Sequence, residues 1–154
     1  MHNWNDEHAL QIIEDCANAG HVLTTALRQL VDCFGFVDDA AIAPLATHFL
    51  RSKAEVYGSI QYYSDFRDQK PGQHVLRICQ AESCQAVGSK KITKFVTAKT
   101  GISLGDTSDD NRLTVEPVYC LGLCANGPAA ELDGQPLAEL DEAKINKILS
   151  GISS

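Results

Sequence analysis

The chain has 154 residues, 44% of them hydrophobic, so it can form one domain or a small domain with a helical appendage and is too apolar to be disordered. Its formal net charge of −7 argues against a nucleic-acid-binding protein, whose contact surface would be basic. No apolar run approaches the roughly 20 residues that cross a bilayer, and the polar N-terminus lacks the basic start and apolar core of a signal peptide. We therefore expect a cytoplasmic protein without a membrane span, in which thiols stay reduced.

The charges are unevenly distributed along the chain. Residues 1–39 carry seven acids and one Arg, and residues 105–142 carry nine acids and one Arg. Residues 51–99 carry nine bases against four acids. This asymmetry fits two interpretations, solvated faces or a surface on which a partner docks.

Helical spacing of apolar residues predicts an N-terminal helical region over residues 1–73. Asn5 or Asp6 can cap the first helix, and Gly35 can end the second. None of these helices can cover its apolar stripe alone, so we expect them to pack together. The predicted helices are residues 6–18, residues 22–34, a segment after Asp39 and a short segment after Ser52.

Two cysteines, Cys16 and Cys33, fall within these helices. Cys16 continues an apolar stripe, and Cys33 sits in an otherwise apolar turn. Because free cysteine behaves as a small hydrophobe, we expect both to be packed thiols. A disulfide or a redox role is the alternative.

Aromatic residues are concentrated near the end of this region, at Tyr57, Tyr62, Tyr63 and Phe66. Aromatics at this density are typical of a core or an interface. We therefore expect these side chains to be buried or to contact a partner, and not to form a cofactor pocket.

From His74 the pattern changes to alternating strands and helices. The order strand, helix, strand, hairpin, helix predicts an α/β domain over residues 74–154. Pro117 confines the second strand to a sheet edge or marks a bulge. The predicted elements are a strand over 74–79, a helix from about 84 to 99 with Val87 facing inward, a strand over 113–120, a hairpin over 129–140 that turns at Asp133-Gly134, and a helix capped by Asp141.

Four cysteines in this domain form two pairs. Cys79 and Cys84 have the spacing Cys-x4-Cys, and after 35 intervening residues Cys120 and Cys124 have the spacing Cys-x3-Cys. Each pair follows a predicted strand. If the two strands are neighbours, both loops emerge at one edge of the sheet and build a four-thiolate pocket. Four thiolates suit either Zn²⁺ or an iron–sulfur cluster.

The second loop favours a cluster over zinc. Its Cys-x3-Cys spacing and apolar residues are less typical of zinc knuckles. Glycines such as Gly122 and Gly127 let backbone N–H groups approach inorganic sulfurs. Four cysteine ligands leave no open position, so the site should move electrons or support structure. A zinc-stapled interaction module, packed cysteines and disulfides are the alternatives from spacing.

Three motifs carry a resemblance to a known family. Together with the N-terminal helices, and with all four cysteines in register, they resemble the thioredoxin-like [2Fe–2S] subunits found beside the NADH-binding flavoprotein of respiratory complex I, NAD-reducing hydrogenases and NAD-dependent formate dehydrogenases. The motifs are Val56-Tyr-Gly-Ser-Ile-Gln-Tyr-Tyr-Ser-Asp-Phe66, His74-Val-Leu-Arg-Ile-Cys79 and Glu116-Pro-Val-Tyr-Cys-Leu-Gly-Leu-Cys124.

Within that family, the sequence around the cysteines is most similar to that of the gamma subunit of soluble, molybdenum-containing formate dehydrogenase. The similar stretches are residues 80–88 and 119–128. Complex I members usually read Glu-Cys-Leu-Gly-Ala-Cys in the second motif, where this chain has Tyr119 and Leu123. The resemblance therefore favours formate dehydrogenase over complex I or a hydrogenase.

The resemblance implies a thioredoxin-like [2Fe–2S] domain preceded by a helical bundle, and the catalytic Cys-x-x-Cys of thioredoxin is absent. It implies one [2Fe–2S] cluster ligated by Cys79, Cys84, Cys120 and Cys124. It also implies docking on a flavoprotein subunit that carries FMN and NADH, and through it on a molybdenum and iron–sulfur catalytic subunit.

The chain itself has no Rossmann Gly-x-Gly-x-x-Gly, so NAD and flavin would belong to the partner. The chain alone would turn over no substrate and would act as a non-catalytic electron carrier within an oxidoreductase. A stand-alone ferredoxin is a further alternative, but it would have little use for the N-terminal helical region.

Overall fold

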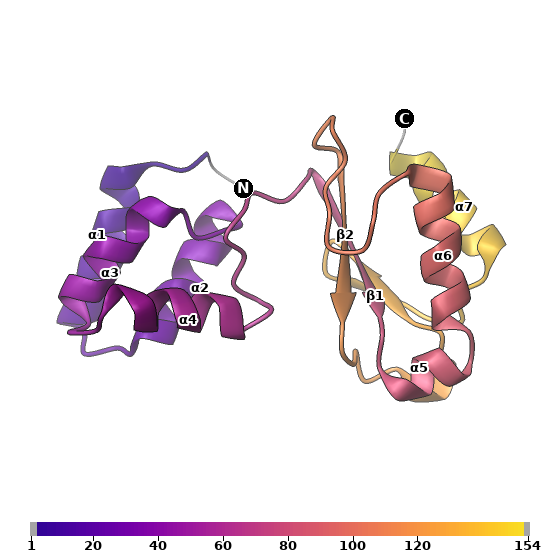
Figure 1. Cartoon of the computed structure of the whole chain (residues 1–154), viewed down its shortest axis with the longest axis horizontal. Helices are drawn as coiled ribbons and strands as arrows, with labels where there is room; N and C mark the ends of the chain where they lie inside the picture. The colour runs from indigo at the N-terminus through magenta and orange to yellow at the C-terminus, as the bar shows by residue number, and fades with distance from the viewer. Residues whose placement is uncertain (1–2, 153–154) are drawn as a thin grey trace. The chain divides into compact units, whose positions relative to one another are not determined.

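The computed structural model describes residues 3–152 (Figure 1). The chain divides into two compact units, Met1–Lys70 and Pro71–Ser154. The first unit is helical, and the second combines a four-stranded sheet with helices.

The helical unit contains the four predicted helices. The Asn5 side chain caps the first helix by accepting the His8 N–H at 2.8 Å, and Gly35 ends the second with a left-handed φ of 87°. A 3-10 turn over Asp39–Ala41 leads into the third helix. The bounds are α1 (Asp6–Asn18), α2 (Leu23–Phe34), α3 (Ile42–His48) and α4 (Lys53–Tyr62).

Helix α4 is longer than predicted. Ser52 and Glu55 form a reciprocal capping box at its start. The helix then continues through Gly58, because Val56 and Ile60 lie one turn apart and both are buried. Half of the aromatic-rich segment is therefore helical.

The core of the helical unit is one cluster of apolar side chains from all four helices. Cys16 is buried in it, with its thiol 3.2 Å from the Gln29 side-chain oxygen. Cys33 is half-buried and packs against the same cluster. Both are free thiols, which confirms the prediction that they are packed.

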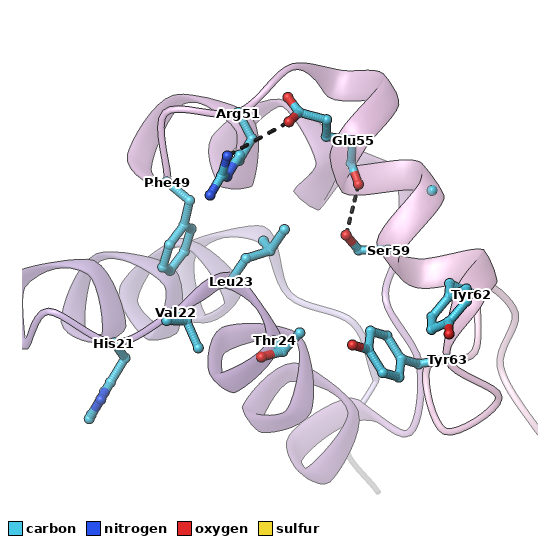
Figure 2. Close-up of a pocket in the computed structure, with 11 residues that line it drawn as sticks. His21, Val22, Leu23, Thr24, Phe49, Arg51, Glu55, Ser59, Tyr62 and Tyr63 are labelled. Carbon is cyan, nitrogen blue, oxygen red and sulfur yellow. Dashed lines mark hydrogen bonds and ion pairs between the residues drawn. The ribbon is translucent and has the colours of Figure 1, made fainter.

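The aromatic residues mostly face solvent. Phe66 packs against the core, whereas Tyr57, Tyr62 and Tyr63 are 50%, 80% and 46% exposed, so of the two predicted roles, core or interface, only an interface is left for these three. Tyr62 and Tyr63 line a groove of about 680 Å³ between α2 and α4. Figure 2 shows Phe49 on one side of this groove and the two tyrosines on the other.

The sheet of the second unit has the order β2-β1-β3-β4. β1 (His74–Cys79) and β2 (Leu113–Val118) are parallel, whereas β3 (Ala130–Leu132) and β4 (Gln135–Leu137) form the predicted hairpin. β2 lies at the edge of the sheet, where the missing N–H of Pro117 is tolerated, as predicted.

Three helices complete this unit: α5 (Glu82–Ala86), α6 (Ser89–Thr100) and α7 (Glu142–Ile152). The sequence pattern predicts a single helix where α5 and α6 lie, and this prediction was wrong. Gly88, with a φ of 108°, interrupts the helix, and Val87 is 53% exposed and does not face inward. Helices α6 and α7 share one apolar core with the sheet and cover the same face of it (Figure 1).

In the part of the chain between residues 3 and 152, no helix combines the length and the apolar character that crossing a membrane requires.

Candidate metal centre

The parallel strands deliver both cysteine pairs to one edge of the sheet. Cys79 is the last residue of β1, and its register partner is Val118, the last residue of β2. The Gln80 N–H donates to the Val118 carbonyl at 2.7 Å, so the ladder continues one residue further. The loop carrying Cys84 and the loop carrying Cys120 therefore start side by side, as the sequence predicted for neighbouring strands.

The first pair is buried. Cys79 and Cys84 are 1% and 2% exposed, and their side chains are hydrogen-bonded to each other. They form a small apolar cluster with Ala129, against which Leu121 and Leu123 of the second loop pack. The two loops thus share one local core.

Burial is the largest influence on the Cys84 thiol and raises its pKa above the ordinary value. The hydrogen bond with Cys79 and the charges of Cys79 and Cys124 raise it further, whereas a hydrogen bond from the Ala129 backbone N–H lowers it. Cys124 of the second pair therefore lies near enough to act on the first. Because a metal binds the thiolate, metal binding at Cys84 would release a proton.

The second pair is exposed. Cys120 has a φ of 117°, a left-handed value that costs a non-glycine residue on the order of 1–3 kcal/mol. The Gly122 backbone N–H donates to the Cys120 sulfur at 3.3 Å. Cys124 opens a 3-10 turn over Cys124–Asn126. An unusual backbone at a predicted ligand, with an N–H directed at its sulfur, is a pattern of functional sites.

Gly127 shows how closely the loops approach each other. A Cβ at this position would lie 2.9 Å from Val87 Cγ2 and 3.5 Å from Cys84 Sγ. A larger residue here would therefore require the Val87 side chain beside the first pair to shift. Four soft sulfur donors, close backbone and N–H groups aimed at sulfur fit an iron–sulfur cluster.

Within the described residues, no three His, Cys, Asp or Glu side chains converge closely enough to hold a metal ion. The four predicted ligands lie on adjacent loops, with one pair buried and the other exposed. Their joint ligation of a cluster stays a prediction.

Two hydrogen bonds that support the first cysteine pair have no counterpart in the sequence pattern. Ser89 donates a hydrogen bond to the Cys79 carbonyl, and the Ala129 N–H bonds to Cys84. Ser89 lies inside the helix predicted from about 84 to 99, so no local signal indicated its bond to a strand end ten residues earlier.

Comparison with known proteins gives one family match, the thioredoxin-like [2Fe-2S] ferredoxin family, over residues 9–153. An NADH-quinone oxidoreductase subunit from Escherichia coli (strain K12) is 30% identical over 149 residues, which are 97% of this chain and 82% of the relative. The NADP-reducing hydrogenase subunit HndA of Solidesulfovibrio fructosivorans is 24% identical over 92% of this chain and 82% of the relative.

Among solved structures, the crystal structure of an NAD⁺-reducing [NiFe]-hydrogenase in the air-oxidized state aligns with a TM-score of 0.72 and 27% identity. The alignment covers 85% of this chain and 22% of that much longer chain. The family match confirms the predicted thioredoxin-like fold with N-terminal helices and the predicted [2Fe–2S] cofactor. The chain therefore belongs to the thioredoxin-like [2Fe-2S] ferredoxin family.

Proposed function

We propose that this chain is the electron-transfer [2Fe–2S] subunit of a multisubunit NAD-linked dehydrogenase. The observation that carries the proposal is the placement of two cysteine pairs at the carboxyl ends of adjacent parallel strands, in a chain of this family. The ligands would be Cys79, Cys84, Cys120 and Cys124. When bound, the cluster would supply one-electron chemistry.

The protein groups divide their roles by exposure. Cys79 and Cys84 would hold the cluster on the buried side, and Cys120 and Cys124 would hold it on the side open to solvent or to a partner. The N–H groups of Gly122 and Ala129 would stabilise negative charge on the sulfurs to which they bond.

The NAD chemistry would belong to another subunit. By their names, the relatives are subunits of an NADH-quinone oxidoreductase and of an NADP-reducing hydrogenase, so they are themselves parts of larger assemblies. This chain lacks a dinucleotide-binding Gly-x-Gly-x-x-Gly. We infer a partner flavoprotein that carries FMN and NADH. Six free cysteines suit the reducing cytoplasm, where we place the complex.

The finer proposal is that the assembly is a formate dehydrogenase and this chain its gamma subunit. It is supported by the sequences of residues 80–88 and 119–128, which resemble that gamma subunit. It is also supported by Tyr119 and Leu123, where complex I members usually carry Glu and Ala. The flavoprotein would then connect this chain to a molybdenum and iron–sulfur catalytic subunit.

Purification of the assembly tests this choice. The chain carries an affinity tag in its own cell and is isolated with its partners, and the complex is assayed for NAD⁺ reduction by formate and by hydrogen, and for quinone reduction by NADH. We expect formate-dependent NAD⁺ reduction and bound molybdenum. Hydrogen-dependent reduction with nickel, or quinone reduction without molybdenum, would contradict the formate assignment and support a hydrogenase or complex I.

A further inference from the structure

Ser89 is a buried hydroxyl beside the first cysteine pair. It is the first residue of α6 and has no exposed surface. Among residues 3–152, the polar side chains that are buried are those of Ser89 and Thr114. Burying a hydroxyl costs free energy unless it is hydrogen-bonded, so the partners of Ser89 indicate what it does.

The Ser89 hydroxyl donates to the carbonyl oxygen of Cys79. The N–H of the same cysteine donates to the Ala129 carbonyl at 3.0 Å. Both backbone polar groups of Cys79 are therefore held, one by α6 and the other by the segment leading into β3. This fixes the backbone from which the Cys79 sulfur projects.

A second set of bonds ties the loop between the two cysteines to the same helix. The Thr93 hydroxyl donates to the Ser89 carbonyl at 3.1 Å and accepts the Gln80 side-chain amide at 3.0 Å. The Gln85 amide donates to the Gln80 carbonyl. Residues on both sides of the loop are thus linked through Thr93 to the first turn of α6, where Ser89 lies.

From this geometry we infer that Ser89 is a positioning residue of the cluster site. Its bond to Cys79 holds the Cys79–Cys84 loop in the conformation that receives the metal, before any metal is present. The inference rests on the proposed function, because positioning matters only if these cysteines are ligands. In Ser89→Ala the Cys79 carbonyl loses the hydroxyl that it bonds in a buried place, and the loop is held by one bond fewer.

The competing explanation is that Ser89 only stabilises the fold. Thr114 offers a matched control, because it is 4% exposed and its hydroxyl accepts the Gly72 N–H at 2.7 Å, away from the cysteines. Thr114→Val therefore removes a buried hydroxyl from the same unit without touching the loop. Both variants should lower the unfolding midpoint of the apo chain.

The experiment loads the full chain with iron and sulfide under anaerobic conditions and follows the visible absorbance after a chelator is added. The midpoint potential and the EPR spectrum of the reduced protein are recorded alongside. We expect Ser89→Ala to lose its cluster about tenfold faster than wild type, as removal of supports around metal ligands commonly does, with a shifted EPR spectrum. Thr114→Val should match wild type in both.

The outcomes distinguish the proposed function from the positioning role of Ser89. A wild-type chain that takes up no iron and sulfide would overturn the proposed function, and the inference with it. If the wild type loads and Ser89→Ala keeps its cluster as long as the wild type, the inference about Ser89 alone is overturned. The same holds if Ser89→Ala and Thr114→Val lose their clusters at equal rates. If Ser89→Ala does not fold, Thr93→Val removes the adjoining links at a half-exposed position, and it should also shorten the cluster lifetime.

Discussion

Cys79 and Val118 are register partners at the carboxyl ends of two parallel strands. Cys120 follows Val118 by two residues, so the two cysteine-bearing loops leave the sheet together. Both loops belong to the second unit, whereas Cys16 and Cys33 belong to the helical unit. We therefore expect the cysteines of the sheet unit and those of the helical unit to respond differently to substitution and to alkylation.

Substitution of single cysteines should separate ligands from packed thiols. Cys84→Ser should lose most of the visible absorbance and iron, because it removes a soft thiolate donor from the buried pair. Cys33→Ser is the control, since Cys33 packs against the helical core. Iron content per chain is the measurement. Full iron in Cys84→Ser, or equal loss in Cys33→Ser, would argue against the ligand assignment.

Gly127→Ala should reduce cluster occupancy without unfolding the chain. The new methyl group would lie 2.9 Å from Val87 Cγ2 and 3.5 Å from Cys84 Sγ, so Val87 would have to shift beside Cys84. The double variant Gly127→Ala/Val87→Ala removes the close contact and should recover occupancy.

The control for that pair is Gly58→Ala. A Cβ at Gly58 meets nothing within 4 Å, and replacing a helical glycine by alanine stabilises by roughly 0.5–1 kcal/mol. This variant should therefore raise the thermal midpoint and leave occupancy unchanged. If the double variant stays as poorly loaded as Gly127→Ala, the contact with Val87 is not the cause.

Alkylation of the metal-free chain with iodoacetamide should follow exposure. Cys120 and Cys124 are exposed and should react first, while Cys79 and Cys84 should react slowly. Cys16 should also be slow, because burial, and to a smaller extent the charge of Asp15, raises the pKa of its thiol. Mass spectrometry of timed samples gives the order. Cys84 reacting as fast as Cys120 would contradict the described burial.

The capping box of α4 predicts a pH effect on the helical unit. Hydrogen bonds from the Ser52 backbone N–H, and then from its hydroxyl, lower the pKa of the Glu55 carboxyl. Because the Glu55 pKa is lower in the folded chain than the unfolded value of about 4.3, the ionised carboxylate stabilises the folded state at pH values above that unfolded value. This stabilisation is lost as the pH falls through the folded pKa of Glu55. The difference in unfolding free energy between wild type and Glu55→Ala should therefore shrink towards pH 3.

Ser52→Ala removes the other half of the box and should cost about 1 kcal/mol near neutral pH. Chemical denaturation followed by circular dichroism measures both variants. A Glu55→Ala difference that stays constant from pH 7 to pH 3 would show that the charged carboxylate is not the stabilising form.

We propose that the helical unit and the sheet unit each depend on their own core. Leu27 and Leu76 are both fully buried, the first in the helical core and the second in the sheet core. Either change to Ala should cost about 2–5 kcal/mol. Leu27→Ala should spare the visible absorbance of the loaded protein and Leu76→Ala should not. Equal loss of absorbance in both variants would contradict independent cores.

Most of the helices and strands were predictable from sequence, because capping residues and a proline mark where they begin or lie. Asn5, Ser52 and Asp141 cap helices as expected, and Pro117 lies on an edge strand. The break at Gly88 was missed, since a glycine inside an apolar helical pattern is usually tolerated and only the loop geometry requires its left-handed backbone.

The sequence predicts four sulfur donors for the candidate site, and their joint ligation stays a prediction, whereas the hydrogen bonds that support the first pair were not predictable from sequence. Cysteine spacing after two strands predicted that the cysteine-bearing loops leave neighbouring strands, which the register confirms, and the resemblance indicated a cluster. The bonds from Ser89 to Cys79 and from the Ala129 N–H to Cys84 join segments far apart in sequence. Such contacts depend on tertiary packing, and no residue pattern within either segment encodes them.

The central claim is a [2Fe–2S] cluster on Cys79, Cys84, Cys120 and Cys124. Its most direct test is iron, zinc and acid-labile sulfide analysis of the pure full chain, with an EPR spectrum after dithionite reduction. We expect a brown protein with about two iron and about two sulfide per chain, whose colour bleaches as a one-electron EPR signal appears. A colourless protein with one stoichiometric Zn²⁺ and no sulfide would contradict it.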